Sequence, residues 1–119
     1  MEKSNTIAAL AALAQESRLD IFRLLVQAGS EGRPVGHIGE RLGLPSATLS
    51  FHLNQLKQAG LVSFRREGRS LIYTANFAVM NGLMGYLTEN CCGGKPADCG
   101  VAVSACDPAS QNIKEGTGA

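Results

Sequence analysis

The stretch from residue 45 to residue 62 constrains the fold more strongly than any other part of this chain. At helical spacing, Leu49, Leu53 and Leu56 form one apolar stripe. The opposite side carries short neutral hydrogen-bonding groups and one cation, but no acid: Ser46, Thr48, Ser50, His52, Asn54, Gln55 and Lys57. A helix buried on one side and lined with such groups on the other fits the DNA major groove. An ordinary amphipathic surface helix shows the same pattern, so the neighbouring segments decide between the two.

Three further helices are expected before this one. The first covers residues 6–14, the second begins at Glu16 or Ser17 and runs to about Ala28, and residues 30–33 form a loop. A short helix is then expected at residues 35–42, followed by a tight turn at Gly43. Two helices joined by a short glycine-containing turn, the second with a polar face, predict a helix-turn-helix.

Two alternating runs after the groove helix predict a β-hairpin. They flank the sequence Arg-Glu-Gly-Arg at residues 66–69, which places a glycine at the tip. Cations at Arg65, Arg66 and Arg69 give this hairpin the character of a wing that contacts phosphates. Asn76 then caps a last helix from Phe77 to about residue 90.

The distribution of charge supports a nucleic-acid partner better than the total does. The net charge of the 119 residues is only +1, but residues 41–75 contain five cations and one acid. No apolar run approaches the roughly 18 residues of a membrane span, so no membrane partner is expected. The first five residues lack the layout of a signal peptide, which predicts a cytoplasmic protein.

The fold class expected from these segments is mainly α with a β-hairpin, a winged helix-turn-helix over residues 1–92. The last helix carries more apolar surface than a small core needs, and the first helix is too short to be stable alone and must pack on this domain or on a second copy. A homodimer formed through the N- and C-terminal helices is therefore expected. The expected dimerisation residues are Ile7, Leu10, Met80, Leu83, Met84 and Leu87. From residue 93 the composition shifts to Gly, Pro, Ser, Asp and Lys, which predicts a flexible cysteine-containing tail over residues 93–119.

Several motifs resemble those of the ArsR/SmtB family of metal-responsive repressors. They are the run Ser-Phe-His-Leu-Asn-Gln-Leu-Lys-Gln-Ala-Gly-Leu-Val at residues 50–62, the hairpin sequence at 66–69 with a tyrosine in the following strand, and Ser-Arg-Leu-Asp-Ile at 17–21. The resemblance covers about residues 7–90. It implies a homodimeric repressor that leaves double-stranded operator DNA when it binds a toxic metal or metalloid.

The chain departs from the family pattern at the metal sites. The best-known arsenic sensors carry a Cys-x-Cys pair at the start of the helix-turn-helix, but residues 36–40 contain no cysteine. Zinc-type members use carboxylates and histidines on the last helix, where residues 77–90 offer only Glu89. What remains resembles the arsenite sensors whose thiols follow the dimerisation helix. The ligand set that this resemblance and the softness of arsenic(III) indicate is Cys91, Cys92 and Cys99.

Other uses of the thiols stay open. A disulfide between Cys91 and Cys92 is disfavoured, because a bond between adjacent cysteines is strained and the expected compartment is reducing. A zinc or cadmium site could use the same thiols together with Cys106. A redox switch could also use these thiols. Antimonite or a trivalent organoarsenical such as methylarsenite could replace arsenite as inducer, and no organic cofactor is expected. An enzyme such as a thiol-dependent arsenate reductase lacks support, because the chain has no phosphate-cradling loop and no βαβ pattern.

Overall fold

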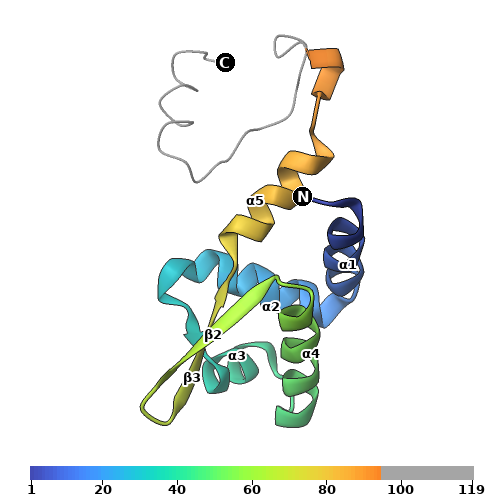
Figure 1. Ribbon diagram of the computed structural model, residues 1–119. Coiled ribbons are helices and arrows are strands. Elements are labelled where there is room, and N and C mark those ends of the chain that lie inside the picture. The colour runs from blue at the N-terminus through green and yellow to red at the C-terminus, as the bar shows by residue number, and fades with distance from the viewer. Residues whose placement is uncertain (95–119) are drawn as a thin grey trace. The chain divides into compact units, whose positions relative to one another are not determined.

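The computed structural model describes residues 1–94, of which residues 1–86 form one compact unit and the rest belong to a second. Figure 1 shows the order of the elements along the chain. The helices and strands are α1 (Lys3–Leu13), α2 (Glu16–Ala28), β1 (Arg33–Pro34), α3 (Val35–Leu42), α4 (Ser46–Gln58), β2 (Val62–Glu67), β3 (Ser70–Ala75) and α5 (Phe77–Leu87), with short 3-10 turns η1 (Gly29–Glu31) and η2 (Cys91–Gly94). The predicted winged helix-turn-helix architecture is confirmed.

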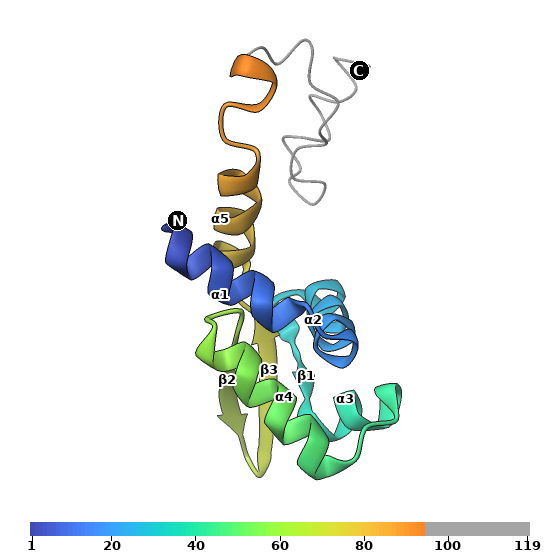
Figure 2. The same cartoon turned by 90° about the vertical axis from the view of Figure 1, so that its right-hand side faces the viewer.

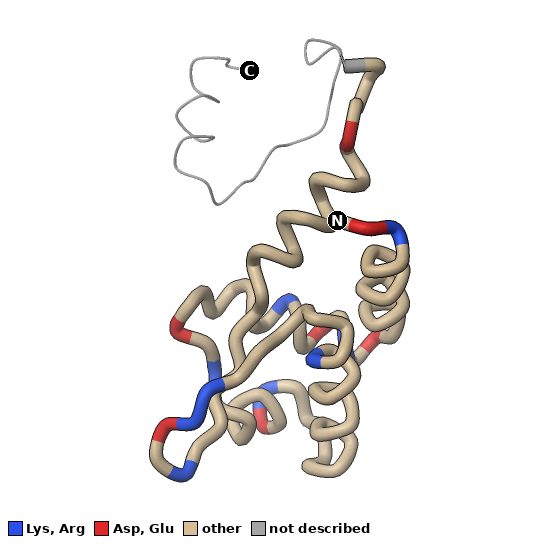
Figure 3. The backbone as a smooth tube through the Cα atoms, in the orientation of Figure 1, with Lys and Arg blue, Asp and Glu red and all other residues tan. Residues whose placement is uncertain are grey.

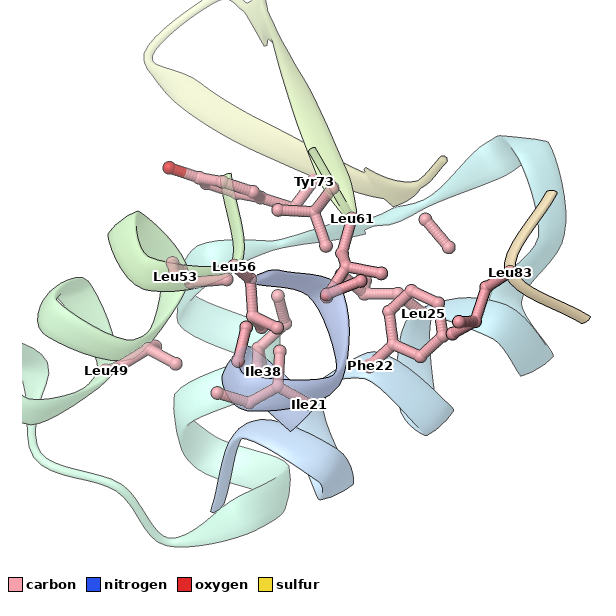
Figure 4. Packing of buried hydrophobic residues seen from close by; sticks show 14 residues of the cluster. Ile21, Phe22, Leu25, Ile38, Leu49, Leu53, Leu56, Leu61, Tyr73 and Leu83 are labelled. Atoms are coloured by element: carbon pink, nitrogen blue, oxygen red, sulfur yellow. The ribbon is translucent and has the colours of Figure 1, made fainter. Parts of the chain in front are cut away.

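The core of residues 1–86 lies where α1, α2, α3 and α4 meet one another and the sheet. Figure 2 shows α1 crossing close to both α2 and α4, in agreement with the contacts between these helices. The apolar stripe of Leu49, Leu53 and Leu56 faces inward, as predicted, and meets Ile21 and Ile38 (Figure 4). Burial of each such side chain stabilises the fold by about 1.5–3 kcal/mol.

Helix boundaries follow from local capping. The side-chain Oε1 of Gln15 accepts a hydrogen bond from the backbone N of Arg18 at 2.9 Å and so begins α2. The C-terminal end of α4 is capped by Gly60, which has φ +80°. The N–H of Gly60 donates to the Lys57 carbonyl, and the N–H of Leu61 donates to the Leu56 carbonyl. This is a Schellman motif, which needs a residue that tolerates the left-handed region, and glycine supplies it. The predicted helix end at Gly60 is therefore confirmed.

The sheet has three antiparallel strands in the order β1-β3-β2, so the prediction of a hairpin alone was incomplete. The hairpin strands pair from Val62 with Ala75 to Glu67 with Ser70, which leaves a two-residue loop at its tip. The missed strand, β1, consists of two residues in the stretch predicted as a loop, and Arg33 pairs with Tyr73. A two-residue strand has no internal periodicity from which it could be recognised.

Helix α5 begins as predicted but ends three residues before residue 90. The N–H of Val79 donates to Oδ1 of Asn76 at 3.3 Å, which is the expected cap. At the other end, Asn90 has φ +56°, a left-handed conformation that asparagine adopts more readily than most residues. The helix ends at Leu87, and the chain turns before it reaches the cysteines.

Two predictions made from the sequence fall partly or wholly beyond the part of the chain that the structure describes. The predicted flexible tail at residues 93–119 overlaps the described residues only at 93 and 94, and Cys99 and Cys106 lie outside them.

None of the helices within residues 1–94 has the length and apolar character needed to cross a membrane.

Candidate nucleic-acid interface and thiol pair

The outer side of α4 is open to solvent and mostly polar. Ser46, Thr48, Ser50 and Asn54 are exposed, whereas Gln55 is half-buried. Gln55 lines a cavity of about 350 Å³ between α1 and α4, together with Ala8 and Arg18. Two apolar residues are exposed on this side, Ala47 and the aromatic Phe51, which is 56% exposed. Most of the predicted base-contacting groups thus lie on one accessible surface, with Gln55 at its edge toward α1.

His52 does not lie on that surface, and its predicted exposure on the DNA-facing side is wrong. The side chain is only 8% exposed, and its Nδ1 atom lies 3.3 Å from Nη1 of Arg18 in α2. Burial, and then the positive charge of Arg18, lower the pKa of His52 below its ordinary value. The spacing of residues 49, 52, 53 and 56 is that of a buried helical stripe, so the sequence carried a signal for this burial.

The hairpin carries the cations that Figure 3 shows gathered near its tip. Arg66 and Arg69 are exposed and have no ion-pair partner within residues 1–94. Arg65, in contrast, bonds Glu67 Oε2 at 2.6 Å and donates to the Glu31 carbonyl at 2.9 Å. Arg65 thereby neutralises the one acid of the hairpin and ties β2 to η1, while the other two cations remain open to an anionic partner.

A cation–aromatic contact joins the end of α4 to the hairpin. Nζ of Lys57 lies 4.9 Å from the centroid of the Phe64 ring, which in turn lies 5.4 Å from the ring of Tyr73. Such a contact is worth about 0.5–1 kcal/mol at an exposed site. It holds the Lys57 ammonium on the side of α4 that faces β2.

The predicted dimerisation residues divide into two groups. Ile7, Leu10 and Leu87 are exposed apolar side chains, as an interface with a second copy requires, and Met84 is 44% exposed. Leu83 is only 7% exposed and points into the same cluster as Phe22 and Leu25 (Figure 4). The placement of Leu83 at a subunit interface is therefore wrong, because this side chain is used by the core of its own chain. Met80 is partly buried against that core.

Cys91 and Cys92 follow α5 in the short turn η2. Cys92 has φ 56° and ψ 35°, so the backbone there is not helical, and the two Sγ atoms lie 3.4 Å apart. A disulfide bond would be about 2.05 Å long. Two thiolates that bind one zinc ion at about 2.3 Å each are separated by at most about 4.6 Å. The two sulfur atoms are therefore close enough for both to bind one thiophilic centre.

The described residues do not complete such a centre. Within residues 1–94, no three side chains of the types His, Cys, Asp and Glu come together as metal ligands would. The third predicted ligand, Cys99, lies outside this range.

The geometry of residues 1–86 defines the class of the protein. Helix α3 packs on the core and precedes α4, whose outer side is open to solvent. The hairpin of β2 and β3, with its exposed arginines, follows α4 directly. Winged helix-turn-helix proteins use these two surfaces for base edges and phosphates.

Comparison with known proteins places the chain in a family of this class. A family model described as a helix-turn-helix domain matches residues 13–63. The transcriptional activator HlyU of Vibrio cholerae is 37% identical over 76 residues, which cover 62% of this chain and 68% of HlyU. The solved structure of HlyU has a TM-score of 0.59 at 35% identity and covers 73% of this chain and 97% of that one.

A second solved structure is a homodimeric winged helix-turn-helix DNA-binding domain from Mycobacterium bovis, described as a possible ArsR-family transcriptional regulator. It has a TM-score of 0.60 at 30% identity and covers 78% of this chain and 86% of that one. The chain therefore belongs to the ArsR-like family of winged helix-turn-helix transcriptional regulators.

Some curated relatives are matched only in part. The nodulation protein NolR of Rhizobium meliloti is 32% identical over 80 residues, which cover 67% of this chain but 63% of NolR. The chain likewise spans 58% of YceK, an uncharacterised HTH-type regulator of Bacillus subtilis.

Proposed function

We propose that this chain is a repressor that binds operator DNA as a homodimer and releases it when arsenic(III) binds the thiolates after α5. The observation that carries the proposal is the 3.4 Å separation of the Cys91 and Cys92 sulfur atoms. The relatives leave the direction of regulation open, since HlyU is named an activator. Arsenite is the inducer proposed first, and antimonite or a trivalent organoarsenical would be accepted by the same thiols.

The output of this mechanism is DNA binding by two α4 helices. In a symmetric dimer they would enter successive major grooves about 34–36 Å apart. The exposed apolar residues Ile7, Leu10 and Leu87 support a dimer formed through the terminal helices. Arg66 and Arg69 would contact phosphates beside each helix.

The input is the pair of thiols. Soft thiolates favour a soft centre over oxygen-seeking cations. Cys91, Cys92 and Cys99 would hold arsenic(III), and the bound metalloid would supply bonds that draw the three sulfur atoms together. The described part of the set supports this assignment, because the helix ends before the cysteines and the backbone at Cys92 has left helical geometry.

Release of DNA requires arsenic(III) to have different affinities for the DNA-free and the DNA-bound dimer. Arsenic(III) lowers operator affinity only if it binds the DNA-free dimer more tightly than the DNA-bound dimer. Coupling free energies of this kind are typically about 1–3 kcal/mol, which corresponds to a change in affinity of about 5- to 150-fold.

The exposure of Cys92 favours a second candidate, a redox-responsive regulator that uses the same thiols. An oxidant can reach this sulfur from solvent, and oxidation needs no third ligand. A zinc- or cadmium-responsive regulator is the remaining alternative, and it would recruit Cys106 as well.

One titration separates these candidates. An operator is first selected from random DNA duplexes with the full chain, and its release is followed by fluorescence anisotropy with arsenite, antimonite, methylarsenite, zinc, cadmium or hydrogen peroxide. We expect release by the arsenic and antimony compounds to be lost in Cys91→Ser and in Cys92→Ser and kept in Cys106→Ser, the matched control. Release by peroxide alone supports the redox candidate. Release by arsenite in both serine variants removes the thiol pair from the mechanism.

A further inference from the structure

Phe51 is an exposed aromatic residue on a helix whose other exposed side chains are small or polar. Its side chain is 56% exposed, and its one ring neighbour within residues 1–94 is the adjacent His52, at 5.6 Å between centroids. It does not belong to the buried cluster or to the residues packed against it. More than half of the residue's surface is therefore open to solvent.

The position of Phe51 on α4 is central to the open side of the helix. Ala47 lies four residues before it and Asn54 three residues after it, so the three share one helical face, and all are exposed. The two edges of this face are marked by Lys57, which packs on Phe64 toward β2, and by Gln55, which lines the cavity toward α1.

We propose that Phe51 selects a T·A base pair by packing on the C5-methyl group of thymine. The proposal rests on the DNA-binding function proposed above and adds a residue that determines sequence preference. In the major groove, base edges present hydrogen-bond donors and acceptors, and the thymine methyl is the apolar group among them. A phenyl ring placed on any other edge would desolvate polar groups without replacing their hydrogen bonds, which costs free energy. Ala47, one turn before Phe51 on the same face, is small and exposed, so it leaves room for a base edge beside the ring.

Phe64 provides the contrast within the same chain. It is 44% exposed, but its ring already lies beneath the Lys57 ammonium and beside Tyr73. Exposure alone does not therefore distinguish the two rings. Phe51 differs because it lies on the exposed face of α4 and lacks a comparable ring or cation partner from another element among the described residues.

The test removes the thymine methyl group and the Phe51 ring separately. The full chain selects duplexes from a random pool. The thymines of the selected site are then replaced by deoxyuridine, which lacks only the methyl group, at one position of each half-site at a time, and each replaced duplex is compared with the thymine duplex. Affinities of the unmodified chain, Phe51→Ala and the control Phe64→Ala are measured on both duplexes at one salt concentration. Thermal melts of the variants confirm that each is folded.

We expect deoxyuridine at one position of each half-site to weaken binding of the unmodified chain and of Phe64→Ala by about fourfold for each buried methyl. Phe51→Ala is expected to bind the thymine and deoxyuridine duplexes equally. If Phe51→Ala discriminates between them as strongly as the unmodified chain does, the proposal is overturned. Selected sites without a preferred T·A pair overturn it as well, while sequence-specific binding still supports the proposed function. A chain that selects no duplex overturns both.

Discussion

Nη1 of Arg18 lies 3.3 Å from Nδ1 of His52, and this contact joins α2 to the helix proposed to enter the groove. The same guanidinium donates through Nε to the Ala12 carbonyl at 2.7 Å. A guanidinium only donates hydrogen bonds, so Nδ1 of His52 must accept, and this requires the neutral imidazole with its proton on Nε2. The pair therefore depends on a histidine that stays uncharged.

This arrangement predicts a loss of stability in mild acid. The pKa of His52 is lowered in the folded chain, chiefly by burial and additionally by Arg18, from an ordinary value of 6.5. Below that value the unfolded chain binds a proton that the folded chain does not, so the free energy of unfolding falls as the pH falls. We expect urea midpoints measured between pH 7.5 and pH 5 to decrease through this range.

The control for that measurement is His52→Gln, which keeps a polar side chain but cannot be protonated. Its urea midpoint at pH 7.5 will be lower than that of the unmodified chain, because the contact with Arg18 is altered. The part of the pH dependence that arises from His52 should disappear. An unchanged pH profile in this variant would show that other groups cause the acid sensitivity.

Arg66 and Arg69 are predicted to contribute to DNA affinity through phosphates. Arg66→Ala and Arg69→Ala should each weaken binding similarly on all sequences. Each substitution removes one cation from both subunits of the proposed dimer, so the salt slope should fall by about 1.8, at about 0.9 for each phosphate contact. Affinities on the selected operator and on a scrambled duplex, measured from 50 to 200 mM salt, test this. Arg23→Ala is the matched control, because Arg23 is exposed on α2. If both hairpin variants bind like this control, the hairpin does not contact DNA.

Arg65 should behave differently from its neighbours. Removal of its side chain leaves Glu67 without its partner at the hairpin and breaks the bond to the Glu31 carbonyl. We expect Arg65→Ala to weaken DNA binding partly through repulsion between Glu67 and phosphates. The double variant Arg65→Ala/Glu67→Gln should then recover part of the affinity. No recovery would indicate that Arg65 itself contacts DNA.

Gly32 is predicted to resist substitution because β3 passes close to it. A Cβ atom at this position would lie 2.5 Å from the Tyr73 carbonyl oxygen, and the backbone has φ +73°. Gly32→Ala should lower the free energy of unfolding by at least about 1–3 kcal/mol, since backbone at φ +73° and ψ −170° is adopted almost only by glycine. Gly36→Ala is the control: nothing lies within 4 Å of its Cβ, and the change should be neutral or stabilising by up to about 1 kcal/mol.

Leu83 and Ile7 are predicted to affect different equilibria. Leu83→Ala removes a buried side chain and should lower the free energy of unfolding by about 2–5 kcal/mol, measured by chemical denaturation. Ile7 is 59% exposed, so Ile7→Ser should leave the core intact and shift sedimentation toward the monomer. If Ile7→Ser stays as dimeric as the unmodified chain, the N-terminal helix does not form the interface.

Local sequence patterns were sufficient for most of the fold. Helix α3 occupies the predicted residues 35–42, and α4 lies within its predicted stretch, because Gly43 and Gly60 mark the ends of both helices. The pairing of β1 with β3 could not be predicted in the same way. It joins Arg33 to Tyr73, forty residues apart, and the close approach at Gly32 that permits it is a property of the packed chain.

The candidate site was predicted less completely. The chemistry of each residue follows from its type, but whether it is exposed depends on what packs beside it. The polarity of His52 and the apolar excess of the last helix led to predicted surface positions for His52 and Leu83. Both residues lie in the interior, because Arg18 packs on His52 and Leu83 belongs to the cluster around Phe22 and Leu25. Phe51 lies off the apolar stripe, and that same displacement leaves its ring on the open side of α4.

Asn76 connects the two helices on which regulation would depend. Its Nδ2 donates to the Gly60 carbonyl at 3.1 Å, its backbone N–H donates to the Leu61 carbonyl at 2.8 Å, and its Oδ1 accepts from Val79. One residue thus caps the start of α5 and binds the chain that leaves α4. The end of α4 and the start of α5 are therefore held together by hydrogen bonds to one residue. A rotation of α5 at this point must either break these hydrogen bonds or turn α4 with it.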